Sequence, residues 1–242
     1  MPPALSIVFP AWNEAKRLPP TLRKVIAFAD ERKLDAEILV VDDGSTDGMG
    51  DVVAKEFGAR IKVLAYGGNR GKGFAVRQGF LAATGTRVLM SDADLSTPIE
   101  EIDHLAKALD EGFDIAMGSR ALGTVVVAQR GVRSFAGKIY NRIIRTILPI
   151  GSFKDTQCGF KLFAREKCRP VFEAMKVDRF SFDVEIVFLA LKAHLRIAEV
   201  PVRWFNDAET KVRFFRDSSR MFADVVRIRW WWSRGGYHSL PR

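Results

Sequence analysis

The chain has 242 residues, of which 48% are hydrophobic and 28% are charged, and its net charge is +9. This composition is typical of a folded globular protein of about one large α/β domain, and it excludes disordered, collagen-like and low-complexity chains. The two cysteines, Cys158 and Cys168, form no CxxC pair and have no histidine near them in sequence, so they indicate neither a disulfide framework nor a zinc site.

Strand and helix signals alternate over the first hundred residues. Short apolar strands are predicted over residues 6–10, 37–41, 61–64 and 87–90, and helices over 15–33, about 48–57 and 71–83. This order predicts an α/β fold with a doubly wound, mostly parallel sheet, whose ligands bind beyond the carboxyl ends of the strands. Carboxylates follow two of these predicted strands, as Asp42-Asp43 and as Asp92 with Asp94.

Two amphipathic helices are predicted in the second half of the chain, over residues 134–148 and 212–232. The second helix is rich in arginine and ends in Trp230, Trp231 and Trp232. Consecutive helical residues point to different sides, so the three indole rings cannot all face one core. Because tryptophan and arginine favour the bilayer interface, this segment is predicted to bind a membrane surface.

Neither a spanning helix nor a cleaved signal is expected. No segment has the ~18 consecutive apolar residues of a membrane-spanning helix, and the first residues lack a basic region followed by an apolar core.

The positive charge is confined to the second half of the chain. Residues 1–119 carry 14 basic and 18 acidic side chains, residues 120–154 carry seven basic and no acidic ones, and residues 155–242 carry 17 basic and 11 acidic ones. This division predicts that the second half meets an anionic partner. Nucleic acid, anionic lipid and phosphorylated substrates all fit the charge.

The sharpest chemical feature is Asp92-Ala93-Asp94. Two carboxylates one residue apart in a strand-to-loop turn can converge on a hard divalent cation, Mg²⁺ or Mn²⁺, that also binds a diphosphate. Such a cation neutralises the charge that develops on a departing nucleotide diphosphate. Taken alone, the pattern also fits a helix cap or a solvent-facing loop, so motifs elsewhere in the chain are needed to choose between these interpretations. No GxGxxG or P-loop accompanies it.

Eight segments of the chain provide such motifs. In chain order they are Phe9–Glu14, Val40–Asp47, Asn69–Gly73, Asp92–Pro98, Gly118–Arg120, Asp155–Phe163, Phe182–Glu185 and Glu199–Val202. Together they resemble the family 2 glycosyltransferases over about residues 5–205. The resemblance implies an inverting enzyme with a GT-A fold that uses a nucleotide sugar. The later segments are similar to the dolichyl-phosphate glucosyltransferase branch, which is close to the polyprenyl-phosphate mannose synthases.

The resemblance implies roles for the matched positions. Asp94 would be the main ligand of Mg²⁺ or Mn²⁺, and it would form the catalytic set with Asp92 and Arg120. The nucleotide-sugar site would consist of Pro10, Ala11, Trp12, Glu14, Asp42, Asp43, Lys72, Asp92 and Ala93. Trp12 stands where a tyrosine is more usual. Ser96 replaces the glutamine of the mannose synthases, which favours the glucosyl branch.

The expected acceptor is the phosphate of a polyprenyl or dolichyl phosphate, and the expected donor is UDP-glucose. A lipid phosphate is already an anion at neutral pH, so its attack on a sugar needs positive charge rather than a general base. Arginine stays charged and binds phosphate through a fork of donors. The resemblance implies that Arg120 reaches the acceptor phosphate, and Arg130, Arg133 and Lys138, which share its stretch without acidic residues, are assigned to the same phosphate. Asp183 and Glu185 fit catalytic residues and buried partners of nearby arginines equally well.

These interpretations predict a catalytic domain over residues 1–210 and a basic, aromatic interface segment over 211–242, peripheral on the cytoplasmic face of a membrane. Three alternatives remain open. The first is a polyprenyl-phosphate mannosyltransferase that uses GDP-mannose, and the second is a family 2 transferase with a non-lipid acceptor. The third is a nucleic-acid-binding module, which the carboxylate-rich first half disfavours; no nucleic-acid partner is expected.

Overall fold

The computed structural model describes residues 1–123, 144–151, 153–205, 214–238 and 240, and for residues 214–219 it describes only the backbone. Three of the expected acceptor-binding residues, Arg130, Arg133 and Lys138, lie outside the described residues. So does most of the helix predicted over residues 134–148, of which only residues 144–147 are described as helical.

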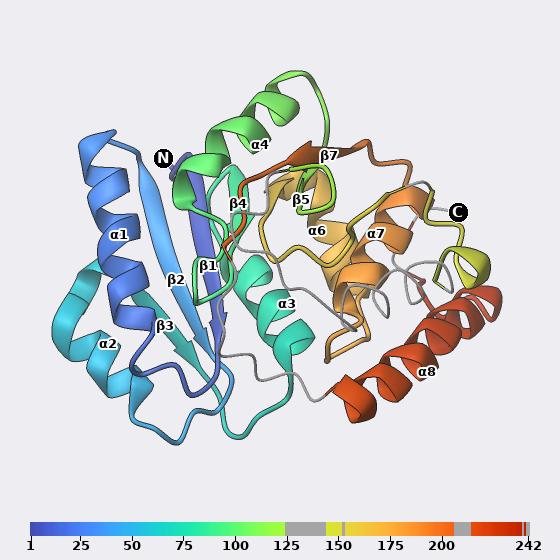
Figure 1. The fold of residues 1–242 in the computed structure, drawn as a ribbon, viewed down its shortest axis with the longest axis horizontal. Coiled ribbons are helices and arrows are strands. Elements are labelled where there is room, and N and C mark those ends of the chain that lie inside the picture. Colours follow the sequence, from blue (N-terminus) through green and yellow to red (C-terminus); the bar gives the residue numbers. More distant parts are fainter. Residues whose placement is uncertain (124–143, 152, 206–213, 239, 241–242) are drawn as a thin grey trace.

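The described part of the chain contains one seven-stranded sheet (Figure 1). Its strands are β1 (Leu5–Ala11), β2 (Ala36–Asp42), β3 (Lys62–Ala65), β4 (Arg87–Met90), β5 (Ile115–Ser119), β6 (Lys161–Ala164) and β7 (Ile197–Pro201). They lie in the order β3-β2-β1-β4-β6-β5-β7. All neighbours are parallel except that β6 runs antiparallel to both β4 and β5. The expected α/β fold with a mostly parallel sheet is therefore confirmed.

Helices cover both faces of the sheet. They are α1 (Leu18–Glu31), α2 (Met49–Phe57), η1 (Gly58–Arg60), α3 (Lys72–Ala82), η2 (Ile99–Glu101), α4 (Ile102–Asp110), α6 (Arg165–Ala174), α7 (Phe182–Lys192) and α8 (Phe214–Ser233). Each helix and strand predicted in the first hundred residues is present. The helix expected over residues 15–33 begins only at Leu18, because the two prolines that follow suit its first turn and leave the residues before it outside the helix.

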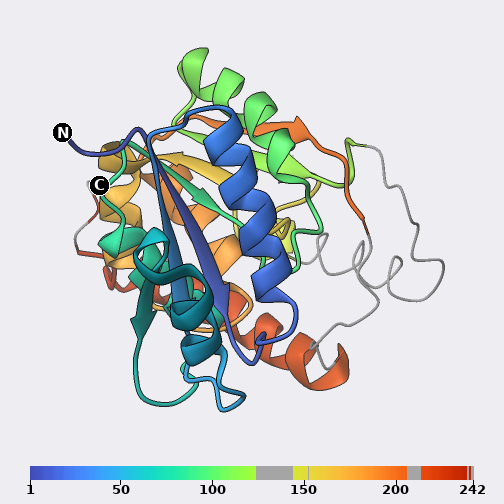
Figure 2. The same cartoon turned by 90° about the vertical axis from the view of Figure 1, so that its left-hand side faces the viewer.

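The buried apolar side chains of the described residues form two hydrophobic cores, and the helices that contribute to them lie on opposite faces of the sheet (Figures 1 and 2). One packs α1 and α4 on the sheet, and the other packs α3, α6 and α7. In the second core Phe80 of α3 stacks on Phe172 of α6, with ring centroids 3.6 Å apart. Because both faces are covered, β1 is buried over its full length, which explains why all of its residues except Ser6 are apolar.

Helix α8 packs against α7 at the edge of the second core, on the side of the molecule that is farther from α1 and α2 (Figure 1). Its buried side chains include Val225 and Ile228. The helix predicted over residues 212–232 is thus confirmed. Among the described helices, none has both the length and the apolar character needed to cross a membrane.

The parallel strands β1, β2 and β4 end at the same edge of the sheet, because β1 pairs with β2 on one side and with β4 on the other. The loops that follow them begin at Trp12, Asp43 and Ser91. The segments singled out in the sequence therefore lie close together in space, at the edge where α/β sheets bind ligands.

Candidate active site

Hydrogen bonds that involve side chains connect the loop after β1 to the loop after β2. Asn13 donates its backbone N–H to Ser45 Oγ (2.9 Å), and its side-chain Oδ1 accepts the N–H of Thr46 (2.8 Å). Asn13 has a φ of +54°, a conformation that asparagine tolerates better than most residues. Asp42 at the end of β2 accepts the N–H of Ser45 (2.8 Å). These bonds fix the two loops relative to each other.

The carboxylate of Asp43 organises the loop that leads to α3. It is buried and accepts four hydrogen bonds, from Tyr66 Oη (2.9 Å), Asn69 Nδ2 (2.9 Å) and the N–H groups of Arg70 and Gly71 (both 2.8 Å). Its charge therefore holds residues 66–71 against the strand ends. Tyr66 is a site residue that the sequence analysis did not single out, and Asn69 lies in one of the eight segments without an assigned role.

The other residues assigned to the nucleotide side lie at the same edge. Pro10 and Ala11 are buried at the end of β1, while Trp12 is 41% exposed. Glu14 is buried and accepts two hydrogen bonds from the guanidinium of Arg17, both of 2.7 Å. Glu14 is thus engaged by an arginine three residues further along the chain.

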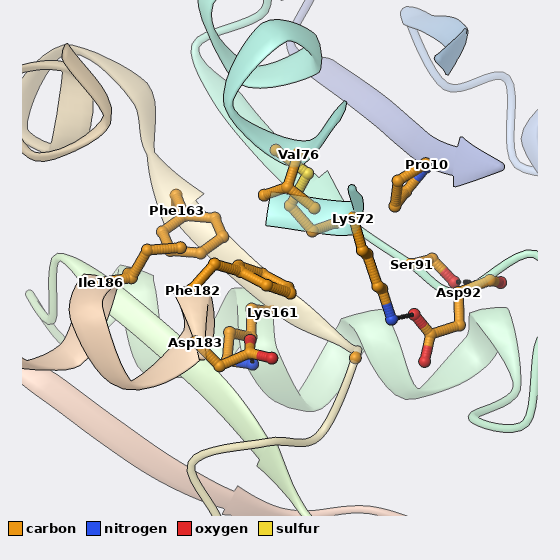
Figure 3. A pocket seen from close by; sticks show the side chains of 12 residues that line it. Pro10, Lys72, Val76, Ser91, Asp92, Lys161, Phe163, Phe182, Asp183 and Ile186 are labelled. Atoms are coloured by element: carbon orange, nitrogen blue, oxygen red, sulfur yellow. Dashed lines mark hydrogen bonds and ion pairs between the residues drawn. The ribbon is translucent and has the colours of Figure 1, made fainter. Parts of the chain in front are cut away.

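Lys72 and Asp92 form an ion pair between the start of α3 and the end of β4. Lys72 Nζ lies 2.5 Å from Asp92 Oδ1, and Figure 3 shows the two side chains pointing toward each other. Burial by itself raises the pKa of Asp92, but the charges of Lys72, Lys161 and Arg120 together outweigh burial, so the pKa of Asp92 lies below its usual value. Asp92 is therefore held ionised.

Another ion pair, between Lys161 of β6 and Asp183 of α7, is buried and lies beside the partly exposed first pair (Figure 3). Lys161 Nζ also donates to the carbonyl oxygen of Cys158 (2.5 Å). Both pairs line a small cavity, which Val76, Phe163, Phe182 and Ile186 close on its apolar side. Burial raises the pKa of Asp183 even though Lys161 and Lys72 oppose the shift. The two lysines and two aspartates balance in charge.

Asp94 is placed differently from Asp92. Its Oδ1 accepts the N–H of Ser96 (3.0 Å), and its pKa is raised by burial and then by the charge of Asp92. An anionic oxygen whose proton affinity is raised by a second carboxylate is a good ligand for a hard cation. Among the described residues, no group of three acidic, histidine or cysteine side chains is placed to hold a metal. The donors present therefore fit an ion that takes its remaining ligands from phosphates and water.

Arg120 lies at the end of β5 in a bidentate pair with Asp155. Its Nε lies 2.6 Å from Oδ2 and its Nη2 lies 2.8 Å from Oδ1, and its backbone N–H also donates to Oδ2 (3.1 Å). The guanidinium carbon is 5.7 Å from the ring centroid of Trp204, after β7. Arg120 contributes to lowering the pKa of Asp92, so it belongs to the same charged region. Asp155 lies in one of the eight segments, but nothing in the sequence indicates that it pairs with Arg120.

Of the two acidic residues left open by the sequence, Asp183 lines the cavity and Glu185 lies away from it. Glu185 is 0% exposed and accepts hydrogen bonds from Tyr237 Oη (2.7 Å) and from the N–H groups of Lys176 and Val177. Both residues are engaged with buried partners, but those partners are a lysine, a tyrosine and backbone amides rather than arginines.

The three consecutive tryptophans at the end of α8 divide between two surroundings. Trp231 and Trp232 pack against the core, and Trp232 meets Phe188 of α7 edge to face at 5.5 Å between ring centroids. Trp230 is 54% exposed. The expectation that the three rings cannot share one environment is confirmed, but two of them contribute to packing.

Comparison with known sequences gives consistent matches. Residues 6–172 match the family described as Glycosyl transferase family 2. The chain is 38% identical over 241 residues to a dolichyl-phosphate beta-glucosyltransferase of Dictyostelium discoideum, with 93% of this chain and 73% of that protein covered. It is 34% identical over 241 residues to the human protein of the same name, with 93% and 74% covered.

Solved structures share the fold at lower identity. A glucosyl-3-phosphoglycerate synthase from Mycobacterium tuberculosis, in complex with phosphoglyceric acid, superposes with a TM-score of 0.70 at 18% identity over 99% of this chain and 81% of that one. The same enzyme in complex with Mn²⁺ and UDP-glucose gives a TM-score of 0.66 at 17% identity, over 99% and 80% of the two chains.

Proposed function

Because the chain belongs to glycosyltransferase family 2, we propose that it transfers glucose from UDP-glucose, with inversion, to the phosphate of a dolichyl or other polyprenyl phosphate. The observation that carries this proposal is the likeness to dolichyl-phosphate beta-glucosyltransferases at 33–38% identity over most of the chain. In the reaction, an oxygen of the lipid phosphate bonds to C1 of glucose. The bond from C1 to the diphosphate breaks, and its electron pair leaves with UDP.

The charged groups at the strand ends suit this chemistry. The acceptor phosphate is already an anion, so Asp92 need not remove a proton from it. Lys72 helps to keep the Asp92 carboxylate ionised. A Mg²⁺ or Mn²⁺ ion at Asp94 would supply charge neutralisation for the leaving diphosphate. Asp43 and the loop over residues 66–71 would form the wall of the nucleotide site.

Arg120 is assigned to the acceptor phosphate. Asp155 grips one edge of its guanidinium through two parallel hydrogen bonds, which fixes the plane in which the remaining donors lie. A fixed arginine loses little conformational freedom when it binds a phosphate. Asp155 is therefore proposed as the residue that orients Arg120 for the acceptor.

The direct experiment supplies the full chain with UDP-glucose or GDP-mannose, Mg²⁺ or Mn²⁺, and either a polyprenyl phosphate or 3-phosphoglycerate. The expected product is glucosyl-phosphoryl-polyprenol, formed only in the UDP-glucose and lipid-phosphate arm. Mannose transfer from GDP-mannose or glucosylation of 3-phosphoglycerate would replace the proposal with one of its alternatives.

Two variants test the assigned roles. Asp94→Asn is expected to remove most turnover and to weaken the binding of Mn²⁺ in the presence of UDP, while circular dichroism shows an intact fold. Arg120→Ala is expected to raise the KM for polyprenyl phosphate, because losing a charge-assisted phosphate contact costs about 1.5–3 kcal/mol. Its matched control is Arg60→Ala, which removes an exposed arginine paired with Asp30. An unchanged acceptor KM in Arg120→Ala would contradict the assignment.

We further propose that the protein is peripheral on a membrane surface, on its cytoplasmic face, through the segment over residues 211–242. In support, three apolar side chains recur every four residues along the exposed side of α8, namely Phe222, Val226 and Trp230, which are 46%, 45% and 54% exposed. Such spacing places them on one face of a helix. Arg227, Arg229 and Arg234 are exposed beside them. Basic residues next to an apolar row suit an anionic bilayer surface.

Sedimentation with liposomes that contain anionic lipid tests this surface. Trp230→Ala and Phe222→Ala should reduce the bound fraction without lowering thermal stability. Added salt should weaken only the part of the binding that comes from the arginines. Wild-type protein that does not sediment with these liposomes at low salt would contradict the proposal.

A further inference from the structure

The turn between α6 and α7, residues 175–179, is held by a buried carboxylate. Glu185 of α7 accepts the N–H of Lys176 through both of its oxygens, at 3.0 and 3.1 Å, and the N–H of Val177 at 2.9 Å. Glu185 is 0% exposed. A carboxyl group would be costly to bury without hydrogen-bond partners, so Glu185 and the turn stabilise each other.

The same turn supports the first residues of α3. This helix has no side-chain cap at its N-terminus, and instead the N–H of Phe74 donates to the carbonyl oxygen of Asp178 (3.1 Å). That carbonyl satisfies one of the N–H groups that a helix leaves unpaired in its first turn. The position of residue 178 therefore sets where α3 begins.

Two glycines allow the turn to approach α3 this closely. A Cβ at Gly71 would lie 2.4 Å from the carbonyl oxygen of Asp178, and a Cβ at Gly73 would lie 2.4 Å from that of Val177. Neither distance is compatible with a side chain. The turn thus packs directly on the backbone on both sides of Lys72, the lysine that pairs with Asp92.

A second contact ties the turn to the same helix. Arg77, one and a half turns into α3, donates from Nη1 to the carbonyl oxygen of Met175 (2.7 Å). The turn is therefore fastened to α3 at both of its ends, and to α7 by Glu185.

The residues that follow α8 close this arrangement from the outside. Tyr237 is buried and donates its hydroxyl to Glu185 (2.7 Å). The Lys176 ammonium lies 5.6 Å from the ring centroid of Trp231 and 5.4 Å from that of Tyr237. Tyr237 thus contacts Glu185, Glu185 contacts the turn, and the turn contacts the start of α3, which carries Lys72.

We infer that Glu185 is a positioning residue for Lys72: it fixes the turn over residues 175–179, the turn fixes the start of α3, and Tyr237 holds Glu185 in place. Glu185 itself lies away from the cavity lined by Lys72 and Asp92, and its hydrogen bonds connect it to that cavity through the turn. The inference rests on the proposed function in one respect, the assignment of Lys72 and Asp92 to the nucleotide-sugar site.

A double-mutant cycle tests the inference, because it separates positioning of Lys72 from a general loss of structure. The variants are Glu185→Ala, Lys72→Met and the two combined. The measurements are the dissociation constant of UDP with Mn²⁺, by calorimetry, and the KM for UDP-glucose. Glu185→Ala should weaken UDP binding about tenfold when Lys72 is present and change it less than twofold when residue 72 is methionine. Equal effects in the two backgrounds, or none in either, would overturn the inference.

Two further variants guard against simple destabilisation. Leu105→Ala removes a fully buried side chain from α4, on the other face of the sheet, and it should lower the melting temperature without changing UDP affinity. If Glu185→Ala does not fold, Tyr237→Phe removes only the hydroxyl that Glu185 accepts, and it should show the same dependence on Lys72 with a smaller effect. Wild-type protein that binds UDP but transfers no glucose would contradict the proposed function and leave this cycle interpretable.

Discussion

The carboxylate of Asp92 occupies the space that a side chain at Gly159 would need. A Cβ at residue 159 would lie 2.1 Å from Asp92 Oδ2 and 2.3 Å from its carboxyl carbon. The loop before β6 therefore passes directly over the carboxylate that pairs with Lys72. A glycine at position 159 is explained by this close approach, because no other residue lacks a Cβ.

Gly159→Ala is expected to displace the Asp92 carboxylate and to lower kcat/KM by about 100-fold, the loss that a shift of about 1 Å in an active site can cause. Arg60→Ala is the control, because it removes an exposed side chain that pairs only with Asp30 among the described ion pairs. Steady-state kinetics and circular dichroism of the two variants check this. A Gly159→Ala enzyme with wild-type turnover would show that Asp92 is not needed where it lies.

Lys72 should govern the pH dependence of activity through Asp92. The Lys72 ammonium lowers the pKa of Asp92 against the effect of burial, so Lys72→Met should raise that pKa. Activity that depends on ionised Asp92 would then be lost at a higher pH on the acidic side of the profile. Lys72→Arg keeps the positive charge and should shift the acidic limb less. Profiles of kcat/KM between about pH 5 and 9 distinguish the variants, and superimposable acidic limbs would contradict the role of the ion pair.

The first half of the fold was readable from the sequence because its signals are local. Strands β1, β2 and β4 are apolar runs that end in polar turns, and α1 has the spacing of a helix with one buried face. Helix α7 gave no such signal, because residues 182–190 are all buried and leave no polar face. Strand β6 has only four residues and begins at the charged residue Lys161. This segment forms a strand because it pairs with β4 and β5.

The site residues also fall into two groups, those predicted from the sequence and those whose pairing depends on tertiary packing. The aspartates at strand ends could be located from the motif and the expected fold, because parallel strands deliver their ends to one edge. Two other ion pairs of the site could not be predicted. Asp155 is 35 residues from Arg120, and Lys161 is 22 residues from Asp183. Such pairs arise from tertiary packing, and no periodicity in the sequence reports them.

The tryptophans of α8 should separate packing from surface binding. Trp232→Ala removes a ring that packs on Phe188 and the surrounding core, and it should destabilise the fold by about 2–4 kcal/mol. Trp230→Ala removes an exposed ring and should change stability by less than about 0.5 kcal/mol. Chemical denaturation of both variants measures this difference. Equal destabilisation by the two substitutions would mean that Trp230 is also part of the packing.

Glu185 should make the stability of the fold depend on pH in an unusual direction. Burial raises its pKa to about 7, although Tyr237 and two backbone N–H groups favour the ionised form. Between its ordinary pKa of 4.5 and about 7, the folded state holds a proton that the unfolded chain has released. The contribution of Glu185 to stability is therefore present at low pH and declines as the pH rises through this window. A glutamine side chain at this position cannot titrate, so Glu185→Gln should gain stability relative to wild type between about pH 5 and pH 8, by a few degrees of melting temperature. Melting curves of the two proteins at about pH 5, 6.5 and 8 measure the change, and the comparison removes every titration that the two proteins share. A difference in melting temperature that stays constant over this range would show that the pKa of Glu185 is not raised.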